Sequence, residues 1–169
     1  MDRYTRMPYF LSVLRRKPPQ VARLAGAPEY ADVRGLVRFY NTPVGVLVAA
    51  EVYHLPAEEE NNGQGVFAFH VHESGPCEQP HEMGKDADPF AMVGTHYNPQ
   101  ERPHPYHAGD MPPLFSNNGY AFQVFLTNRF TLGEIKGKTV IIHKNVDDFT
   151  TQPSGGAGEK IACGDIRMW

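Results

Sequence analysis

The chain has 169 residues, a formal net charge of −3 and 41% hydrophobic residues, which suffices for one domain with its own core. Its 16 glycines and 15 prolines indicate many turns, and few stretches show helical periodicity, so the pattern predicts an all-β fold. Residues 39–169 carry eight Lys and Arg against sixteen Asp and Glu. This acidic balance excludes nucleic acid as an expected partner, and no apolar run reaches the length of an integral membrane segment.

The N-terminal part differs in charge from the rest, and we interpret residues 1–30 as a basic extension before one domain over residues 31–169. The apolar run from Met7 to Leu14 is short for the core of a signal peptide, and a basic cluster follows where small residues would mark a cleavage site. We expect a partly ordered extension with one helical turn. The alternative is contact with a membrane surface through the Arg cluster, Tyr9, Phe10 and Leu14.

Strand patterns begin at about residue 31, where Val33, Val37 and Phe39 alternate with Arg34 and Arg38. Further strands are predicted over residues 44–55, 66–73, 120–127 and 138–143, with exposed loops over 57–65 and 150–158. Residues 74–118 contain eight prolines and no long periodic segment. A stretch of that length without regular structure is uncommon in a compact domain and is usually functional.

Histidines gather at three places in the predicted strands and loops. His70 and His72 lie two apart in a predicted strand and so point to the same side of it, with Cα atoms about 6.5 Å apart. His143 ends another predicted strand and could close the same site. Ligation by histidine alone suits Cu(II).

A second group lies on the long loop, where His96, His104, His107 and Asp110 fall within fifteen residues. Three imidazoles and one carboxylate match a closed tetrahedral zinc site. The alternative is a histidine-rich exposed loop that binds no metal. Because the loop over residues 96–110 has little core of its own, we expect a bound metal ion to order it.

Four segments together resemble the copper–zinc superoxide dismutase family. They occur in the family's order, and the similarity covers roughly residues 31–166: His70-Val71-His72-Glu73, Gly94-Thr95-His96-Tyr97-Asn98-Pro99, His107-Ala108-Gly109-Asp110 and Gly158-Glu159-Lys160-Ile161-Ala162-Cys163-Gly164. The resemblance implies an eight-stranded, immunoglobulin-like Greek-key β-barrel or sandwich with two long functional loops. It also implies an oxidoreductase that converts superoxide to oxygen and hydrogen peroxide by Cu(II)/Cu(I) cycling beside a structural zinc.

The resemblance assigns a role to each of these side chains. His96 matches the histidine that bridges both metals and takes part in catalysis. Asp147 matches an aspartate that hydrogen-bonds one ligand of each metal; alternatively it is a solvated turn carboxylate. The implied copper ligands are His70, His72, His96 and His143, and the implied zinc ligands are His96, His104, His107 and Asp110. His54 and His81 match no ligand position and are expected on the surface.

Cys77 and Cys163 fall where the family has an intrasubunit disulfide, with two free thiols as the alternative. A disulfide favours an oxidising compartment, whereas the absence of a recognisable signal peptide favours the cytoplasm. We expect an intracellular, cytoplasmic protein, with an extracytoplasmic location as the alternative. A homodimer is left open.

Lys160 marks a departure, because the family has an anion-guiding arginine at this position. Lysine keeps the charge that attracts superoxide but lacks the planar fork that places a small anion. Glu159 beside it lowers the local positive potential. These departures bear on rate. The alternative to an enzyme is a non-catalytic copper- and zinc-binding protein on the same scaffold.

Overall fold

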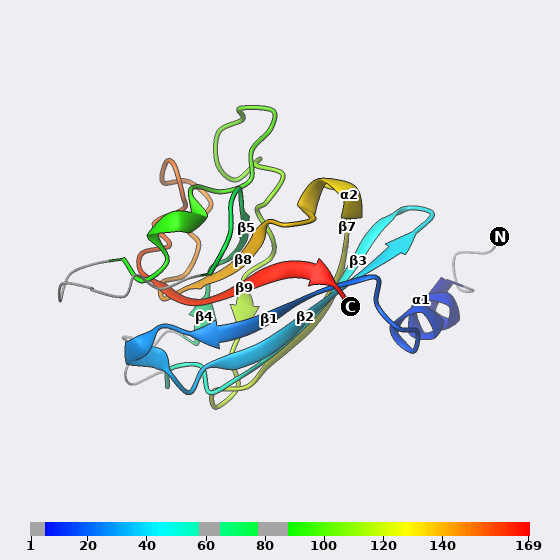
Figure 1. Ribbon diagram of the computed structural model, residues 1–169, viewed down its shortest axis with the longest axis horizontal. Coiled ribbons are helices and arrows are strands. Elements are labelled where there is room, and N and C mark those ends of the chain that lie inside the picture. The colour runs from blue at the N-terminus through cyan, green and yellow to red at the C-terminus, as the bar shows by residue number, and fades with distance from the viewer. Residues whose placement is uncertain (1–5, 58–64, 78–87) are drawn as a thin grey trace.

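A computed structural model of the protein describes residues 6–57, 65–77 and 88–169 (Figure 1). Within these ranges nine strands account for most of the regular structure: β1 (Gln20–Gly26), β2 (Arg34–Thr42), β3 (Gly45–Tyr53), β4 (Val66–Phe67), β5 (Phe69–His72), β6 (Leu114–Phe115), β7 (Ala121–Thr127), β8 (Thr139–His143) and β9 (Lys160–Met168). The helical segments are short: α1 (Arg6–Leu14), α2 (Leu132–Ile135) and two 3₁₀ turns, η2 (Pro28–Tyr30) and η3 (Ala91–Val93). The strands predicted near 33–39, 44–55, 66–73, 120–127 and 138–143 are thereby confirmed.

Seven strands form one antiparallel sheet in the order β5-β8-β9-β1-β2-β3-β7, and β4 pairs with β6. Ala68 alone separates β4 from β5, so the two behave as one bent strand, while β6 lies beside β7. The β4–β6 pair therefore connects the two edges of the curled sheet. With β4 and β5 taken as one strand, the described part of the chain forms the eight-stranded Greek-key barrel that the sequence predicts.

Strand β3 shows how the sequence covers both sides of this sheet. Val46, Val48, Ala50 and Val52 face the barrel core and are at most 2% exposed, as alternation requires. Leu47 and Ala49 point outward, yet they are also buried, because α1 packs on this outer face of β2 and β3. In Figure 1 helix α1 lies beside the β2–β3 hairpin, at one end of the barrel.

The barrel begins earlier in the chain than expected. Strand β1 lies before the boundary that we placed at residue 31, and it pairs with β2 on one side and β9 on the other. The alternation of apolar and polar residues is weak in Gln20–Gly26, because five of its seven residues are small or polar. Ala22 can face either the core or the solvent. Before β1, the described residues form only α1 and its connection to the barrel.

The two long loops emerge from the same end of the barrel, opposite α1 in the view of Figure 1. One loop runs from β5 to β6 and the other from β8 to β9. The loop region of the sequence with eight prolines is thus the first of these connections. Residues 78–87 of that loop, which include His81, lie outside the described part of the chain.

Candidate metal centre

Strand pairing brings His70, His72 and His143 together. Strand β5 pairs with β8, and His70 lies opposite Ile141 and His72 opposite Thr139. His143 follows at the end of β8, where its backbone N–H donates to the carbonyl oxygen of Ala68 at 2.9 Å. All three imidazoles are at most 4% exposed, so the barrel wall holds them in fixed positions.

The first long loop lies against β5 through backbone hydrogen bonds. Tyr97 donates to Val71, Val71 donates to Gly109, and Gly109 donates to Tyr97, each over 2.8 Å. A side chain at Gly109 would collide with the carbonyl oxygen of Val71, which explains why glycine is needed for this close approach. The same docking sets His96 opposite His72 and Asp110 opposite His70. Hydrogen bonds therefore order this part of the loop.

The first group of candidate ligands consists of His70, His72, His96 and His143, whose ligand atoms all lie within 4.8 Å of one another. The outer nitrogens are bound to the protein: Nδ1 of His72 to the carbonyl of Gly94 at 2.9 Å, and Nδ1 of His143 to that of Gly158 at 3.2 Å. The inner Nε2 atoms of His72 and His143 lie 3.2 Å apart. Nδ1 of His70 and Nε2 of His96 are buried and have no hydrogen-bond partner.

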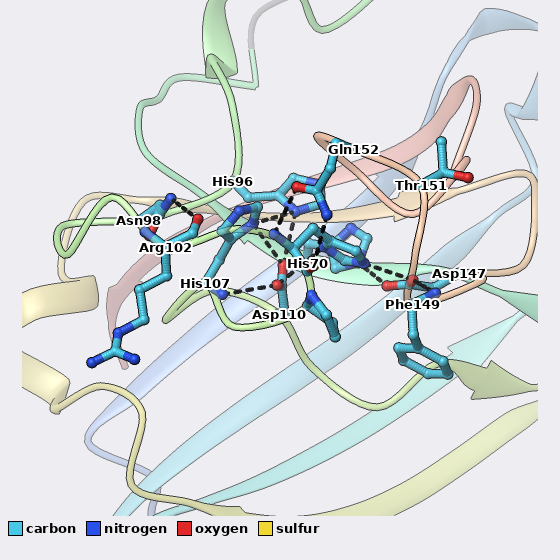
Figure 2. A network of polar contacts seen from close by, with 12 residues as sticks. His70, His96, Asn98, Arg102, His107, Asp110, Asp147, Phe149, Thr151 and Gln152 are labelled. Carbon is cyan, nitrogen blue, oxygen red and sulfur yellow. Dashed lines mark hydrogen bonds and ion pairs between the residues drawn. The ribbon is translucent and has the colours of Figure 1, made fainter.

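The second group consists of His96, His104, His107 and Asp110, again with ligand atoms within 4.8 Å of one another. Oδ1 of Asp110 lies 2.8 Å from Nδ1 of His96 and 3.2 Å from Nδ1 of His107, and Oδ2 lies 3.1 Å from Nδ1 of His104. Nδ1 of His104 has no hydrogen-bond partner despite its burial. Figure 2 shows His96, His107 and Asp110 converging from the loop.

Both groups fit metal ions on the chemistry of their donors. Buried polar atoms in proteins almost always have hydrogen-bond partners. Three buried ring nitrogens here make no hydrogen bond, although one of them, Nδ1 of His104, lies 3.1 Å from Oδ2 of Asp110, and this indicates metal ligands. Four imidazoles suit copper, and three imidazoles with one carboxylate suit zinc. His96 belongs to both groups, with Nδ1 facing the second and Nε2 facing the first.

Asp147 links the two groups through hydrogen bonds to the outer nitrogens of two histidines. Its Oδ2 accepts a hydrogen bond from Nε2 of His70 and its Oδ1 one from Nε2 of His104, each over 2.8 Å (Figure 2). Gly155 lies directly against this carboxylate, has φ +69° and leaves no room for a side chain. Because each ring donates its outer proton to Asp147, the inner Nδ1 atoms of His70 and His104 are left as lone pairs.

The electrostatics of the site favour neutral imidazoles and charged carboxylates. Burial lowers the pKa of His70 to about 4 against the opposing effect of Asp147, and burial likewise lowers the pKa values of His72 and His143 well below 6.5. Burial alone would raise the pKa of Asp147, but the hydrogen bonds from the two imidazoles outweigh it and lower the pKa to about 2. Neutral imidazole and ionised carboxylate are the forms that bind metals.

Sequence reasoning missed two side chains that hold the loops in place. Nη1 of Arg129 lies within hydrogen-bond distance of three carbonyl oxygens of the first loop: Pro105, His107 and Asp110, at 2.8, 3.3 and 3.4 Å. Gln152 of the second loop bonds both the N–H and the carbonyl of His104, at 3.0 and 2.8 Å. Neither residue belongs to a motif, because its contacts are with backbone atoms far away in the sequence.

The structure also places the two cysteines, Lys160 and His54. Cys77 and Cys163 form a disulfide, as expected. Lys160 is the first residue of β9 and lies opposite His143, and its ammonium group is paired with the carboxylate of Asp88. His54 is exposed and lies in neither group, in agreement with the sequence interpretation.

Fold and site together define a Greek-key β-barrel metalloprotein with two adjacent metal groups that share one histidine. A family model described as copper/zinc superoxide dismutase matches residues 33–166. The chain belongs to the copper/zinc superoxide dismutase family.

Individual relatives agree with this assignment. The chain is 34% identical over 141 residues to the superoxide dismutase [Cu-Zn] of Legionella pneumophila, covering 79% of this chain and 77% of that protein. It is 31% identical over 151 residues to superoxide dismutase [Cu-Zn] 2 of Aquifex aeolicus, with 80% of each covered. Among solved structures, the Cu/Zn superoxide dismutase from Brucella abortus superposes with a TM-score of 0.71 at 26% identity, covering 87% of this chain and 98% of that one.

Proposed function

We propose that this chain dismutates superoxide, with copper held by the first group of histidines and zinc by the second. Two superoxide anions and two protons give one molecule of oxygen and one of hydrogen peroxide. The observation that carries the proposal is the sharing of His96, because a ring with one nitrogen in each group couples the two metal sites. A protein that merely stored copper or zinc would not need this shared ligand.

Copper supplies the one-electron redox chemistry, whereas zinc has none and acts on structure and charge. The protein's own groups supply orientation and a proton site. Nε2 of His96 has no protein partner, so this atom would be available to hold copper or to carry a proton. Asp147 and the carbonyls of Gly94 and Gly158 hold the outer nitrogens of the other rings, which keeps their inner nitrogens available.

Lys160 is the proposed guiding cation for superoxide. It lies next to the copper group through its pairing with His143, and its side chain is 16% exposed. A positive group near the entrance of a buried site raises the encounter rate of a small anion, and this effect weakens as salt screens it.

Metal analysis combined with a superoxide-consumption assay tests the proposal. The protein should bind about one copper and one zinc per chain, as the two ligand groups require. Replacing His70 and His72 by Ala should remove copper and dismutation while most of the zinc stays, because neither residue belongs to the second group. His54→Ala is the control, since this exposed histidine lies in neither group. Dismutation at the parent rate in the double variant would contradict the copper assignment.

The compartment and the oligomeric state are part of the proposal. None of the helices in residues 6–57, 65–77 and 88–169 has the length and apolar character to span a membrane. The bond between Cys77 and Cys163 supports the oxidising, extracytoplasmic alternative over the cytoplasm. The homodimer stays a prediction. Cell fractionation and sedimentation of the purified protein test the two points.

A further inference from the structure

Lys160 does not stand alone beside the copper group. Its ammonium group is paired with the carboxylate of Asp88, a residue 72 positions earlier that belongs to the other long loop. The Lys160 side chain is 16% exposed and that of Asp88 is 40% exposed. The cation assigned above to anion guidance therefore already has an anion of the protein as its partner.

Asp88 is held in place by its own segment. Its Oδ1 accepts the backbone N–H of Phe90 at 2.9 Å, which leaves Oδ2 for Lys160. Phe90 is 2% exposed and packs in a cluster with Val93, Ile141 and Cys163. The carboxylate thus sits on an anchored turn and needs little ordering to meet Lys160.

The same segment is tied to the copper group. Six residues after Asp88, the carbonyl oxygen of Gly94 bonds Nδ1 of His72 at 2.9 Å. At the other end of the ion pair, Lys160 lies opposite His143 in the β8–β9 register. Asp88 and Lys160 are therefore fixed to the two sides of the same site.

A second pair repeats the arrangement beside His143. The ammonium group of Lys144, the next residue in the chain, lies 3.8 Å from Oε2 of Glu159, and Tyr30 donates a hydrogen bond to the same oxygen at 3.3 Å. Both lysines that flank His143 thus face a carboxylate. The local field that would attract an anion is weaker than the two lysines alone would make it.

We propose that Asp88 is a positioning residue that restrains Lys160 and limits the attraction of the copper group for small anions. The inference rests on the proposed function of Lys160 and extends it to the residue that controls it. Removing the Asp88 charge frees the ammonium group to turn toward an incoming anion. Loss of this one negative charge near the path of a univalent anion should raise the association of the anion with the copper group about two- to fivefold at low ionic strength.

Asp88→Asn is the variant of choice, because the Asn oxygen can still accept the N–H of Phe90 while the charge is lost. Azide binding to the Cu(II) protein, followed by absorption, should tighten about two- to fivefold at low salt, with a steeper decline as salt rises. Superoxide consumption should rise by a similar factor. Glu51→Gln is the matched control: it also removes a carboxylate from an ion pair, at 3.5 Å from Arg38, but on the outer face of β3.

One further measurement separates this inference from the proposed function. Brief acylation of lysines followed by peptide mapping needs no metal, and labelling of Lys160 should increase in Asp88→Asn but stay unchanged in Glu51→Gln. If the purified protein bound no copper, the proposed function would fail while the labelling result still tested the pair.

In a Lys160→Gln background, Asp88→Asn should change azide affinity less than in the parent, because no ammonium group is left to release. An equal change in both backgrounds, or unchanged azide affinity in Asp88→Asn, would overturn the proposal.

Discussion

At the scale of single residues, the site depends on which nitrogen of each imidazole is left free. The sequence indicates which histidines belong together, and the family resemblance implies that Asp147 bonds one ligand of each metal. The structure adds the carbonyl oxygens of Gly94 and Gly158 as acceptors of the other outer protons. Asp147 serves one ring of each group and is 2% exposed. A carboxylate in that position fixes ring orientation in both groups at once.

Asp147→Asn should therefore weaken the binding of both metals. The carboxylate accepts one N–H donor on each of its charged oxygens, whereas the amide has only one accepting oxygen and no charge. We expect affinity for copper and zinc to fall about 10- to 100-fold, the usual range for groups that orient metal ligands. Competition with a chelator of known affinity measures this for each metal. Asp148→Asn provides the control, since the hydrogen bonds of this neighbouring carboxylate come from Thr150 and Thr151. Equal losses in the two variants would rule out the bridging role.

At the scale of elements, the disulfide and the docking of α1 are two attachments outside the sheet pairing. The disulfide joins the first long loop to β9, and Phe90 and Ile141 pack around Cys163. The helix α1 places Val13 against Tyr40, Leu47 and Ala49 on the outer face of the sheet. Each attachment can be tested by a separate experiment.

Reduction of the Cys77–Cys163 bond should lower the free energy of unfolding by about 2–5 kcal/mol, the range typical of native disulfides in small domains. Thermal unfolding with and without reductant measures the loss. A Cys77→Ser, Cys163→Ser double variant should match the reduced parent and should not respond to reductant. Two alkylated cysteines in the freshly isolated, unreduced protein would contradict this prediction.

Val13→Ala should lower the free energy of unfolding by about 1–2 kcal/mol, because it removes two methyl groups from a side chain that is 2% exposed. Leu11→Ala is the matched control in the same helix, because Leu11 is 54% exposed. Urea unfolding of both variants gives the comparison, and faster proteolysis before residue 20 in Val13→Ala would show that α1 has detached. Similar stability losses in both variants would mean that α1 does not dock through Val13.

Sequence patterns predicted the elements whose alternation is strong and missed those that depend on distant partners. The run around Val46 to Val52 reads as a strand because its β-branched residues stand out. Strand β1 has small and polar residues and becomes a strand only between β2 and β9. The same holds within the site: spacing motifs indicated the candidate ligands, whereas the contacts of Asp88 and Arg129 are with residues far away in the sequence and follow from no local pattern.

At the scale of the whole molecule, the buried histidines make the metal-free protein sensitive to acid. In the folded protein the pKa values of His70, His72 and His143 lie below 6.5, and that of His70 is about 4. As pH falls, the unfolded chain therefore binds protons at these histidines before the folded protein does. The free energy of unfolding must then fall as pH falls from about 6.5 toward 4. Asp147, with a pKa of about 2, adds a loss only below about pH 4.

Urea unfolding of the metal-free, disulfide-bonded protein at pH 7.5 and pH 5 measures this effect. The free energy of unfolding should be clearly lower at pH 5. The metal-loaded protein should hold its stability further into acid, until protons displace the metals from the same nitrogens. Equal stability of the metal-free protein at both values would mean that the imidazoles are not buried as neutral groups.

The position of the disulfide along the chain has a consequence for the order of assembly. The bond spans 86 positions, from 77 to 163, and all four zinc candidates lie inside this covalent ring within fifteen residues of one another. His70 and His72 lie before Cys77, outside the ring, and meet His143 only when β5 pairs with β8. Short loops close at lower entropic cost than long ones, so the zinc group can form before the barrel wall is complete. The chain should therefore acquire zinc early and copper last.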